Sequence, residues 1–438
     1  MMSLLSERIS VRFLLVAGLI VLLLVPVALV DGVAAERERY YRTALESVAQ
    51  AYGYAQQLSG PLLIVPATTV HRGTRDDGKP YERRSTHEHI VLPQRLDVAV
   101  DLSHQYRRRG LYDVPVYLTD LRIEGHFDLT QRGAIDRQYD EVHWDRAQIV
   151  IGVSDPRAIK NSSSFRFEQR EYRLQPGTQQ SDLRQGLSIP LDITAALAGD
   201  FALSLTLAGT ERLAVAPVGD QTRLQVRADW PHPSFDGTFL PYDYELTASG
   251  FDASWAINAL ARGVPTSFRR EEQSLDFLSN LAGVSIYQPV TQYTIVDRGL
   301  KYAVLFLALT FLAVLCFELI TQTQLHLVQF GVIGLAMVLF YLVVLALSEH
   351  IAFGLAYVVA ASLIVGLLTN YARGITRNRR QTLAFFGLQV ALYSVLFLTL
   401  RLEDAALLTG TTLLVLGLAA LMWTTRNLHR QPLVTAAV

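Results

Sequence analysis

Three consecutive residues at the end of an apolar run, Ser348, Glu349 and His350, carry the hydroxyl, carboxylate and imidazole groups of a nucleophilic triad. A triad needs these groups to converge on one reacting atom, which consecutive residues cannot do. Their position between two apolar runs instead favours a tight hairpin at a membrane interface, anchored by Glu349 and His350. The second interpretation is that this pair docks a soluble domain onto membrane helices.

Two acidic residues, Glu403 and Asp404, form a similar short turn between later apolar runs. We expect them on the same side of the membrane as His350, and the three residues together offer side-chain types that a metal ion accepts. Solvated turns remain the favoured interpretation, so we expect no metal and no cofactor. The sequence does predict a polar cluster where these turns meet the soluble part of the chain.

Two polar motifs of the central region have both a binding and a plain structural interpretation. His87 and His89 flank Glu88, and this spacing places both imidazoles on one side of a strand, where they can bind zinc. No H-E-x-x-H motif accompanies them, and a polar edge is favoured. The basic run 107–109 is either a solvated strand end or a contact for lipid phosphates or anionic cell-wall polymers.

The most unusual string of the central region is WPHPSF, at 230–235. Its two prolines cannot donate hydrogen bonds to a central ladder, so we expect an edge, a bulge or a corner. Trp230 and Phe235 then either pack at that corner or are displayed to a protein partner or a glycan. Packing is the favoured interpretation.

The elements that must position these residues are apolar runs of the length that crosses a bilayer. The first run has 18 residues, and at about 1.5 Å per residue it just spans a hydrocarbon core of about 30 Å. A cleavable signal peptide is usually shorter, so we expect an uncleaved signal anchor. The six predicted spans are 13–30, 301–320, 327–347, 351–371, 383–400 and 405–424.

Arginines orient these spans. Arg8 and Arg12 precede the first span, four arginines fill the loop 372–382, and Arg426 and Arg430 follow the last. By the positive-inside rule, both termini are cytoplasmic and residues 31–299 are exported. That exported stretch has 29 Lys and Arg against 35 Asp and Glu, an acidic balance that argues against a nucleic-acid partner and leaves membrane lipids as the expected one.

The exported stretch begins with helical spacing and continues with strand spacing. Residues 31–60 predict an amphipathic stalk helix that Gly60-Pro61 ends. Beyond it, alternating residues such as Phe201, Leu203 and Leu205 predict about ten half-buried strands in an antiparallel sandwich-like domain, 61–299, with one helix near 271–281. The predicted fold class is therefore an α+β membrane protein with a signal-anchor helix, a large β-rich domain and a five-helix bundle.

Two further residues limit the chemistry. Cys316 is the only cysteine and lies in a predicted span, so thiolate metal sites and disulfides of the exported part are excluded. Glu318 lies near the cytoplasmic end of the same span; a proton relay is the functional interpretation, and interfacial anchoring is favoured. The middles of the other spans carry almost no ionisable group, which argues against an ion-coupled transporter.

Several strings in both parts of the chain match one family. They are GPLLIVP at 60–66, RRRGLYDVPVY at 107–117, SD at 154–155, WPHPSFDG at 230–237, FLP at 239–241, GF at 250–251, KYAVLF at 301–306, FYLVVLALSEH at 340–350, EDAALL at 403–408 and TR at 425–426. The chain resembles CreD, the bacterial inner-membrane cell envelope integrity family. This resemblance implies a periplasmic domain, control by an envelope-stress or carbon-source two-component system, and a part in the β-lactam response. It supplies no catalytic residue, and Ala158 and Thr291 depart from the expected strings.

We therefore expect a non-enzymatic protein whose periplasmic domain binds or senses a cell-wall or envelope partner. The candidate functional surface comprises Ser348, Glu349, His350, Glu403, Asp404, Trp230 and Phe235. Two alternatives stay open: a membrane-embedded enzyme acting on lipid or cell-wall precursors, which needs these polar residues to converge, and a transporter component, which needs a polar path through the bundle.

Overall fold

The structure is a computed structural model that describes residues 2–76, 79–180, 183, 185–286, 292–321, 325–376, 378–401 and isolated positions from 408 to 422. It divides into two compact units. The membrane unit comprises Met1–Arg42 and Pro289–Val438, and the β-rich unit comprises Thr43–Gln288. An α+β chain with a large β-rich region is thus confirmed.

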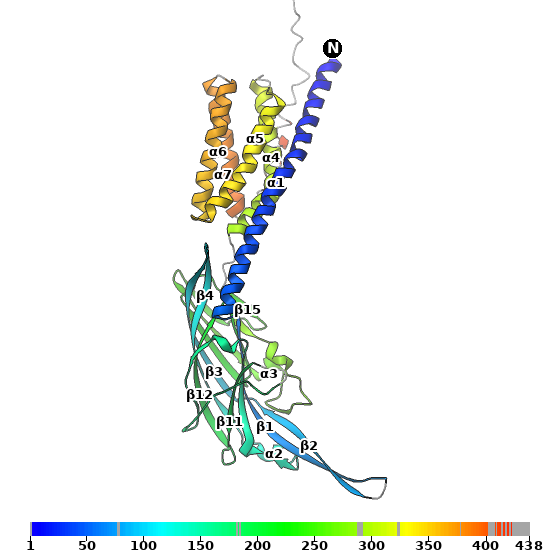
Figure 1. The fold of residues 1–438 in the computed structure, drawn as a ribbon, viewed down its shortest axis with the longest axis vertical. Coiled ribbons are helices and arrows are strands. Elements are labelled where there is room, and N and C mark those ends of the chain that lie inside the picture. Colours follow the sequence, from blue (N-terminus) through cyan, green and yellow to red (C-terminus); the bar gives the residue numbers. More distant parts are fainter. Residues whose placement is uncertain are drawn as a thin grey trace, which may run out of the picture. The chain divides into compact units, whose positions relative to one another are not determined.

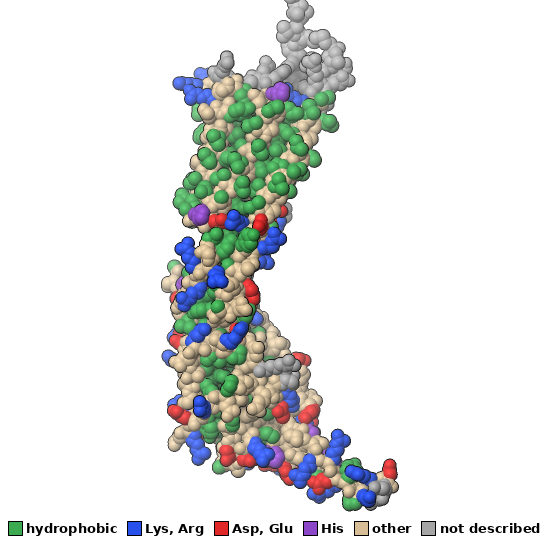
Figure 2. Space-filling model, in the orientation of Figure 1, with side chains coloured by type: hydrophobic (Ala, Val, Ile, Leu, Met, Phe, Trp, Pro, Cys, Tyr) green, Lys and Arg blue, Asp and Glu red, His purple; other side chains and the backbone are tan. Residues whose placement is uncertain are grey.

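Five of the described helices are long and apolar enough to cross a membrane, and one of them is N-terminal. They are α1 (Met2–Tyr52), α4 (Gln292–Thr321), α5 (Leu327–Ser348), α6 (Phe353–Thr376) and α7 (Arg379–Arg401) (Figure 1). Figure 2 shows hydrophobic side chains over much of the visible face of the membrane unit, and leucines of this unit such as Leu335 and Leu363 are exposed. Each of the first five predicted spans falls largely within one of these helices, and most of the sixth, 405–424, lies outside the described residues.

The helix that begins the β-rich unit ends earlier than predicted. α1 stops at Tyr52, and Gly60-Pro61 lies inside strand β1 (Gln56–Thr74) instead of ending the stalk. The turn occurs at Gly53, whose φ of +140° favours glycine and where a Cβ would lie 2.7 Å from the carbonyl oxygen of Ala208. The close approach of Gly53 to the backbone of Ala208 therefore sets the end of α1. The spacing of apolar residues in the sequence does not reveal such a contact.

Two sheets build the β-rich unit. The first follows the order β10-β11-β6-β1-β13-β19-β15, with β2, β5 and β18 attached, and the second follows β16-β17-β14-β3-β4-β12-β8-β9, with β7 attached. One hydrophobic core holds buried side chains of both sheets, for example Leu62 and Leu203. The remaining strands are β2 (Pro80–Val91), β3 (Arg95–Arg109), β4 (Tyr112–Asp128), β5 (Glu141–Val142), β6 (Ala147–Val153), β7 (Ile159–Ser162), β8 (Phe165–Phe167), β9 (Arg170–Tyr172), β10 (Gln175–Pro176), β11 (Gly186–Leu191), β12 (Ala198–Gly209), β13 (Arg212–Ala216), β14 (Gln221–Ala228), β15 (Ser234–Gly237), β16 (Asp243–Thr247), β17 (Gly250–Asn258), β18 (Ser267–Arg269) and β19 (Ala282–Ser285).

Strand directions are mostly antiparallel, as predicted, with two exceptions. β1 runs parallel to β13, and β3 runs parallel to β14. Alternation of apolar and polar residues indicates which face of a strand is buried, and it carries no information about the direction of the neighbouring strand. The alternation pattern therefore predicted the strands but could not establish that every neighbouring pair runs antiparallel.

The helix predicted near 271–281 is a single 3₁₀ turn, Leu275–Ser279. Its apolar side chains Leu275, Phe277 and Leu278 are all buried, so they do not form the one-sided stripe of a surface helix. The two described α-helices inside the β-rich unit are only one turn long, α2 (Arg132–Asp136) and α3 (Ala259–Arg262).

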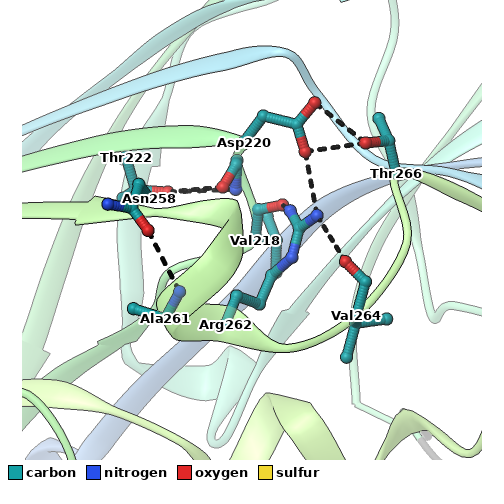
Figure 3. Close-up of polar contacts among 9 residues, drawn as sticks. Val218, Asp220, Thr222, Asn258, Ala261, Arg262, Val264 and Thr266 are labelled. Atoms are coloured by element: carbon teal, nitrogen blue, oxygen red, sulfur yellow. Dashed lines mark hydrogen bonds and ion pairs between the residues drawn. The ribbon is translucent and has the colours of Figure 1, made fainter.

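One buried arginine joins loops of the β-rich unit (Figure 3). Arg262 donates through Nη2 to Asp220 Oδ1 and to the carbonyl oxygen of Val264, both at 2.9 Å, and through Nη1 to the carbonyl of Val218. Thr266 donates to the same carboxylate at 2.8 Å. Burial lowers the pKa of the Arg262 guanidinium, and Asp220 opposes that shift. We call Asp220, Arg262 and Thr266 the arginine clasp.

Candidate functional site

The predicted Ser348–His350 turn lies between α5 and α6 in the membrane unit. Ser348 is buried, and its hydroxyl donates to the carbonyl oxygen of Leu345 at 2.9 Å. This hydroxyl is therefore already engaged in a hydrogen bond within the last turn of α5. Glu349 Oε1 lies 3.8 Å from Arg37 Nε and accepts from the Tyr293 hydroxyl at 3.4 Å. His350 is exposed. The Ser348 hydroxyl and the Glu349 carboxylate have separate partners and the His350 side chain is exposed, so Glu349 anchors the turn against α1 and α4.

The two other acidic candidates cannot be placed with this turn. Glu403 and Asp404 lie outside the described residues. Among the residues that the structure does describe, no group of three or more His, Cys, Asp and Glu side chains is arranged to hold a metal ion. The polar cluster of the predicted periplasmic side therefore consists, in its described part, of Arg37, Tyr293 and Glu349.

A second ion pair lies at the other end of the same helices. Arg12 Nη2 is 2.5 Å from Glu318 Oε1, and that carboxylate also accepts from the backbone N–H of Leu325 at 3.1 Å. Arg12 and Arg37 are about 38 Å apart along an ideal helix, close to the thickness of a bilayer that includes part of its headgroups. Glu318 is thus held at a helix end, in agreement with the anchoring interpretation.

The histidine motif of β2 forms a buried network. His89 is buried, with Nδ1 3.1 Å from the Tyr139 hydroxyl and Nε2 2.6 Å from Ser267 Oγ. His87 lies on the same side of the strand, with Nδ1 3.1 Å from Glu271 Oε1. Burial lowers the pKa of His89 to about 4, and the nearby Arg269 adds to this shift. Both ring nitrogens of His89 are engaged, so this histidine serves packing instead of metal binding.

Trp230 is buried, as the favoured packing interpretation expects. It is 4% exposed, and its indole N–H donates to the carbonyl oxygen of His232 at 2.8 Å. Its ring contacts that of His104, with centroids 5.3 Å apart, and His104 Nδ1 lies 2.8 Å from Asp229 Oδ1. These contacts support packing at a corner, because display to a partner requires an accessible ring.

Phe235 lies where the chain crosses from the first sheet to the second. It belongs to β15, and its half-buried ring contacts Tyr244, Phe251 and Trp255 with centroid distances of 5.3, 5.6 and 5.9 Å. The indole N–H of Trp255 donates to the carbonyl oxygen of Phe239 at 3.0 Å. Phe235 therefore covers the core where the chain passes between the sheets, and its ring packs against Tyr244 in the segment that follows.

Those following residues form a surface that sequence reasoning missed. We call Leu240, Tyr242, Tyr244 and Leu246 the aromatic edge; they are 66%, 71%, 56% and 53% exposed. Three of them lie on or just before β16, which pairs only with β17 and so ends the second sheet. The signal was available in the sequence, because Leu240 follows the crossing and alternates with tyrosines, but alternation alone does not say which face is open.

A charged hollow of ≈ 420 Å³ lies beside this edge, over strands β3, β4, β14 and β17. Its polar lining includes Asp97, Arg122, Glu124, Arg223 and Gln225, and Tyr242 of the aromatic edge contributes a ring. The hollow thus combines hydrogen-bond donors, acceptors and an aromatic face, which is the set that holds a polar ligand with apolar faces, such as a sugar.

Comparison with known proteins covers both units. The family model described as "Inner membrane protein CreD" matches residues 8–430. The inner membrane protein CreD of Escherichia coli (strain K12) is 32% identical over 420 residues, which are 94% of this chain and 91% of that protein. An M1 zinc metallopeptidase of Deinococcus radiodurans is similar over 44% of this chain and 42% of its own, at 11% identity and a TM-score of 0.21, a value too low for any structural argument.

Proposed function

The chain belongs to the CreD family of inner membrane proteins, and from that premise we propose that its β-rich unit lies in the periplasm and binds an envelope component without catalysing a reaction. In this proposal the protein supports envelope integrity under stress, including β-lactam stress, and both termini are cytoplasmic. The arginine bias of the loops supports the orientation. The engagement of Ser348 and Glu349 with other groups supports a binding function over a catalytic one.

The observation that carries the proposal is the aromatic edge beside the charged hollow. Four large side chains exposed together are unusual on a polar unit, and such patches mark binding surfaces. Tyrosine rings stack on the apolar faces of sugar rings, while Arg223, Gln225 and Asp97 can bond hydroxyl groups. We infer that the ligand is a glycan-bearing polymer of the cell wall.

The test uses the full-length protein in detergent and isolated peptidoglycan sacculi. Tyr242→Ala with Tyr244→Ala should weaken binding to sacculi by about thirtyfold, because each of the two lost aromatic contacts is worth about 1 kcal/mol. Tyr81→Ala is the matched control, since Tyr81 is also exposed but lies on β2, away from the hollow. Undiminished binding of the double variant would refute a glycan site at this edge.

Orientation is tested separately in a Cys316→Ser background. A cysteine in place of Leu197, on the β-rich unit, should react with an impermeant maleimide in intact spheroplasts. A cysteine in place of Gly374, where a side chain meets open space, should react only after permeabilisation. The reverse pattern would contradict the periplasmic assignment.

One observation favours a transporter component as the second candidate. Gln389 of α7 is fully buried, and neither of its amide atoms has a hydrogen-bond partner among the described residues. The buried hydroxyls of Tyr341 and Tyr393 likewise have no hydrogen-bond partner among the described residues. Unpaired polar groups are costly in an apolar bundle. If they serve a solute, Gln389→Leu will abolish complementation of a deletion strain; if complementation persists, this candidate fails.

A further inference from the structure

We propose that the tip of the β3–β4 hairpin, residues 106–112, binds the headgroups of anionic phospholipids at the membrane surface. This inference goes beyond the glycan proposal and is independent of it, because none of the residues 106–112 lines the charged hollow or belongs to the aromatic edge. The hairpin tip contains the basic run noted in the sequence, flanked by an aromatic and an aliphatic residue. Its chemistry, its place in the β-rich unit and the path of the chain point to the same partner.

The hairpin tip offers cations without countercharge. Arg108 and Arg109 are exposed, and their guanidinium groups make no hydrogen bond or ion pair with another described residue. The nearest acidic residue in register is Asp113, opposite Arg108, and the two form no ion pair. Guanidinium groups bind phosphate oxygens in a bidentate manner and are weakly hydrated, so two free arginines suit a phosphate-rich surface.

The apolar members of the hairpin tip suit the same surface. Tyr106 is 47% exposed and Leu111 is 41% exposed, with the three arginines between them. Tyrosine and arginine are typical of the headgroup region, where one part of the side chain meets hydrocarbon and the other meets water. Arg107 is set apart from its neighbours, because its guanidinium lies 5.1 Å from the ring centroid of Tyr52.

The register of the strands places the hairpin tip at the end of the β-rich unit where the chain enters and leaves. Tyr54, just after α1, accepts from the backbone N–H of Thr210, and Ile286, just after β19, donates to the carbonyl oxygen of Glu211. Both contacts adjoin Gly209, which pairs with Tyr117 at the limit of the β4–β12 ladder. From that pair the hairpin extends five more residues, about 17 Å (Figure 1).

The chain segments at this end lead directly into membrane helices. α4 begins at Gln292, six residues after Ile286, and α1 reaches this end with Val48 packed against Val114 and Val116 of the hairpin. By connectivity, then, this end is the part of the β-rich unit nearest to lipid along the chain. The opposite end, where Ala198 pairs with Asp128, carries the exposed Leu197 and supplies a control position.

The test places a bimane probe on the full-length protein in a Cys316→Ser background, at Leu111→Cys or at the control Leu197→Cys. Vesicles contain lipid-borne quencher in phosphatidylcholine, with or without an equal part of phosphatidylglycerol. We expect strong quenching at position 111 only when phosphatidylglycerol is present, and none at position 197. Raising NaCl to about 0.5 M should reduce that quenching even when the arginines are unchanged, since salt screens the attraction between the arginines and the anionic headgroups.

Matched charge reversals complete the experiment. Arg108→Glu with Arg109→Glu should reduce quenching at position 111 by about fivefold or more, because each arginine near an anionic surface favours binding by about that factor. Arg83→Glu with Arg84→Glu, an adjacent exposed pair on β2, should leave it unchanged. Absence of quenching at position 111 would overturn the proposal, as would equal quenching in pure phosphatidylcholine or with the Arg108/Arg109 reversal.

Discussion

The two units place their charged groups in opposite ways. In the β-rich unit, two ionisable side chains are buried and engaged: Arg262 reaches three acceptors and both nitrogens of His89 have partners. In the described membrane unit, Arg12 pairs with Glu318 and Arg37 with Glu349 on either side of the apolar stretch of α1. A fold in water can distribute its buried polar contacts, whereas a membrane fold concentrates charge where water is within reach.

The largest effect is expected from opening the arginine clasp. Arg262→Met leaves the Asp220 carboxylate without its cation and two loops without their common donor, so we expect a loss of about 3 to 5 kcal/mol in the free energy of unfolding. Urea unfolding of the full chain, followed by tryptophan fluorescence, measures it. Arg223→Met, an exposed arginine of the second sheet, should change stability by less than about 0.5 kcal/mol. An equally small loss of unfolding free energy in Arg262→Met would contradict the view that buried charged contacts stabilise the β-rich unit.

A pH-dependent loss is expected from His89. Its folded pKa of about 4 is below the unfolded value near 6.5, so the unfolded state binds the proton first as pH falls. The stability that neutral His89 contributes is present above pH 6.5 and is lost between there and pH 4, by about 3 kcal/mol.

The measurement compares the pH dependence of urea unfolding with that of two variants. His89→Gln should lose about 3 kcal/mol less of its unfolding free energy between pH 6.5 and pH 4 than the wild type does. His87→Gln, two residues away on the same strand, should show the same loss as the wild type. Identical pH profiles for wild type and His89→Gln would mean that the buried network tolerates the charged imidazole.

The smallest effects are expected at the two ends of the membrane unit, and they should differ. A double-mutant cycle on Arg12 and Glu318 should give a coupling energy of about 2 kcal/mol, because the carboxylate is buried and also holds the Leu325 N–H. The same cycle on Arg37 and Glu349 should give about 0.5 kcal/mol, since that pair is longer and its arginine is more exposed. Unfolding in mixed micelles supplies both values, and equal couplings would show that depth and distance do not rank these pairs.

The parts of the fold that could be predicted from sequence are those with a local cause. Runs of about twenty apolar residues predict spans wherever they occur, and the alternation around Phe201 predicts a strand without knowledge of its neighbours. The partners of Glu349 could not be predicted, because Arg37 and Tyr293 are brought to it by helices far away in the chain. For Trp230 the prolines indicate a corner and favour packing, and only the fold shows that the ring beside them is covered.

The position of β1 has a consequence for biogenesis. This strand lies early in the chain, yet its parallel partner β13 starts at Arg212, and β13 is in turn completed by β19, which ends at Ser285. If the β-rich unit is exported as we propose, this edge of β1 stays open while the roughly 140 residues between β1 and β13 are translocated, and an open strand edge is prone to wrong pairing. The sheet is completed by β19 only shortly before α4 leaves the translocon. In the proposed orientation, maturation of the β-rich unit and lateral insertion of the helix bundle therefore fall in the same interval.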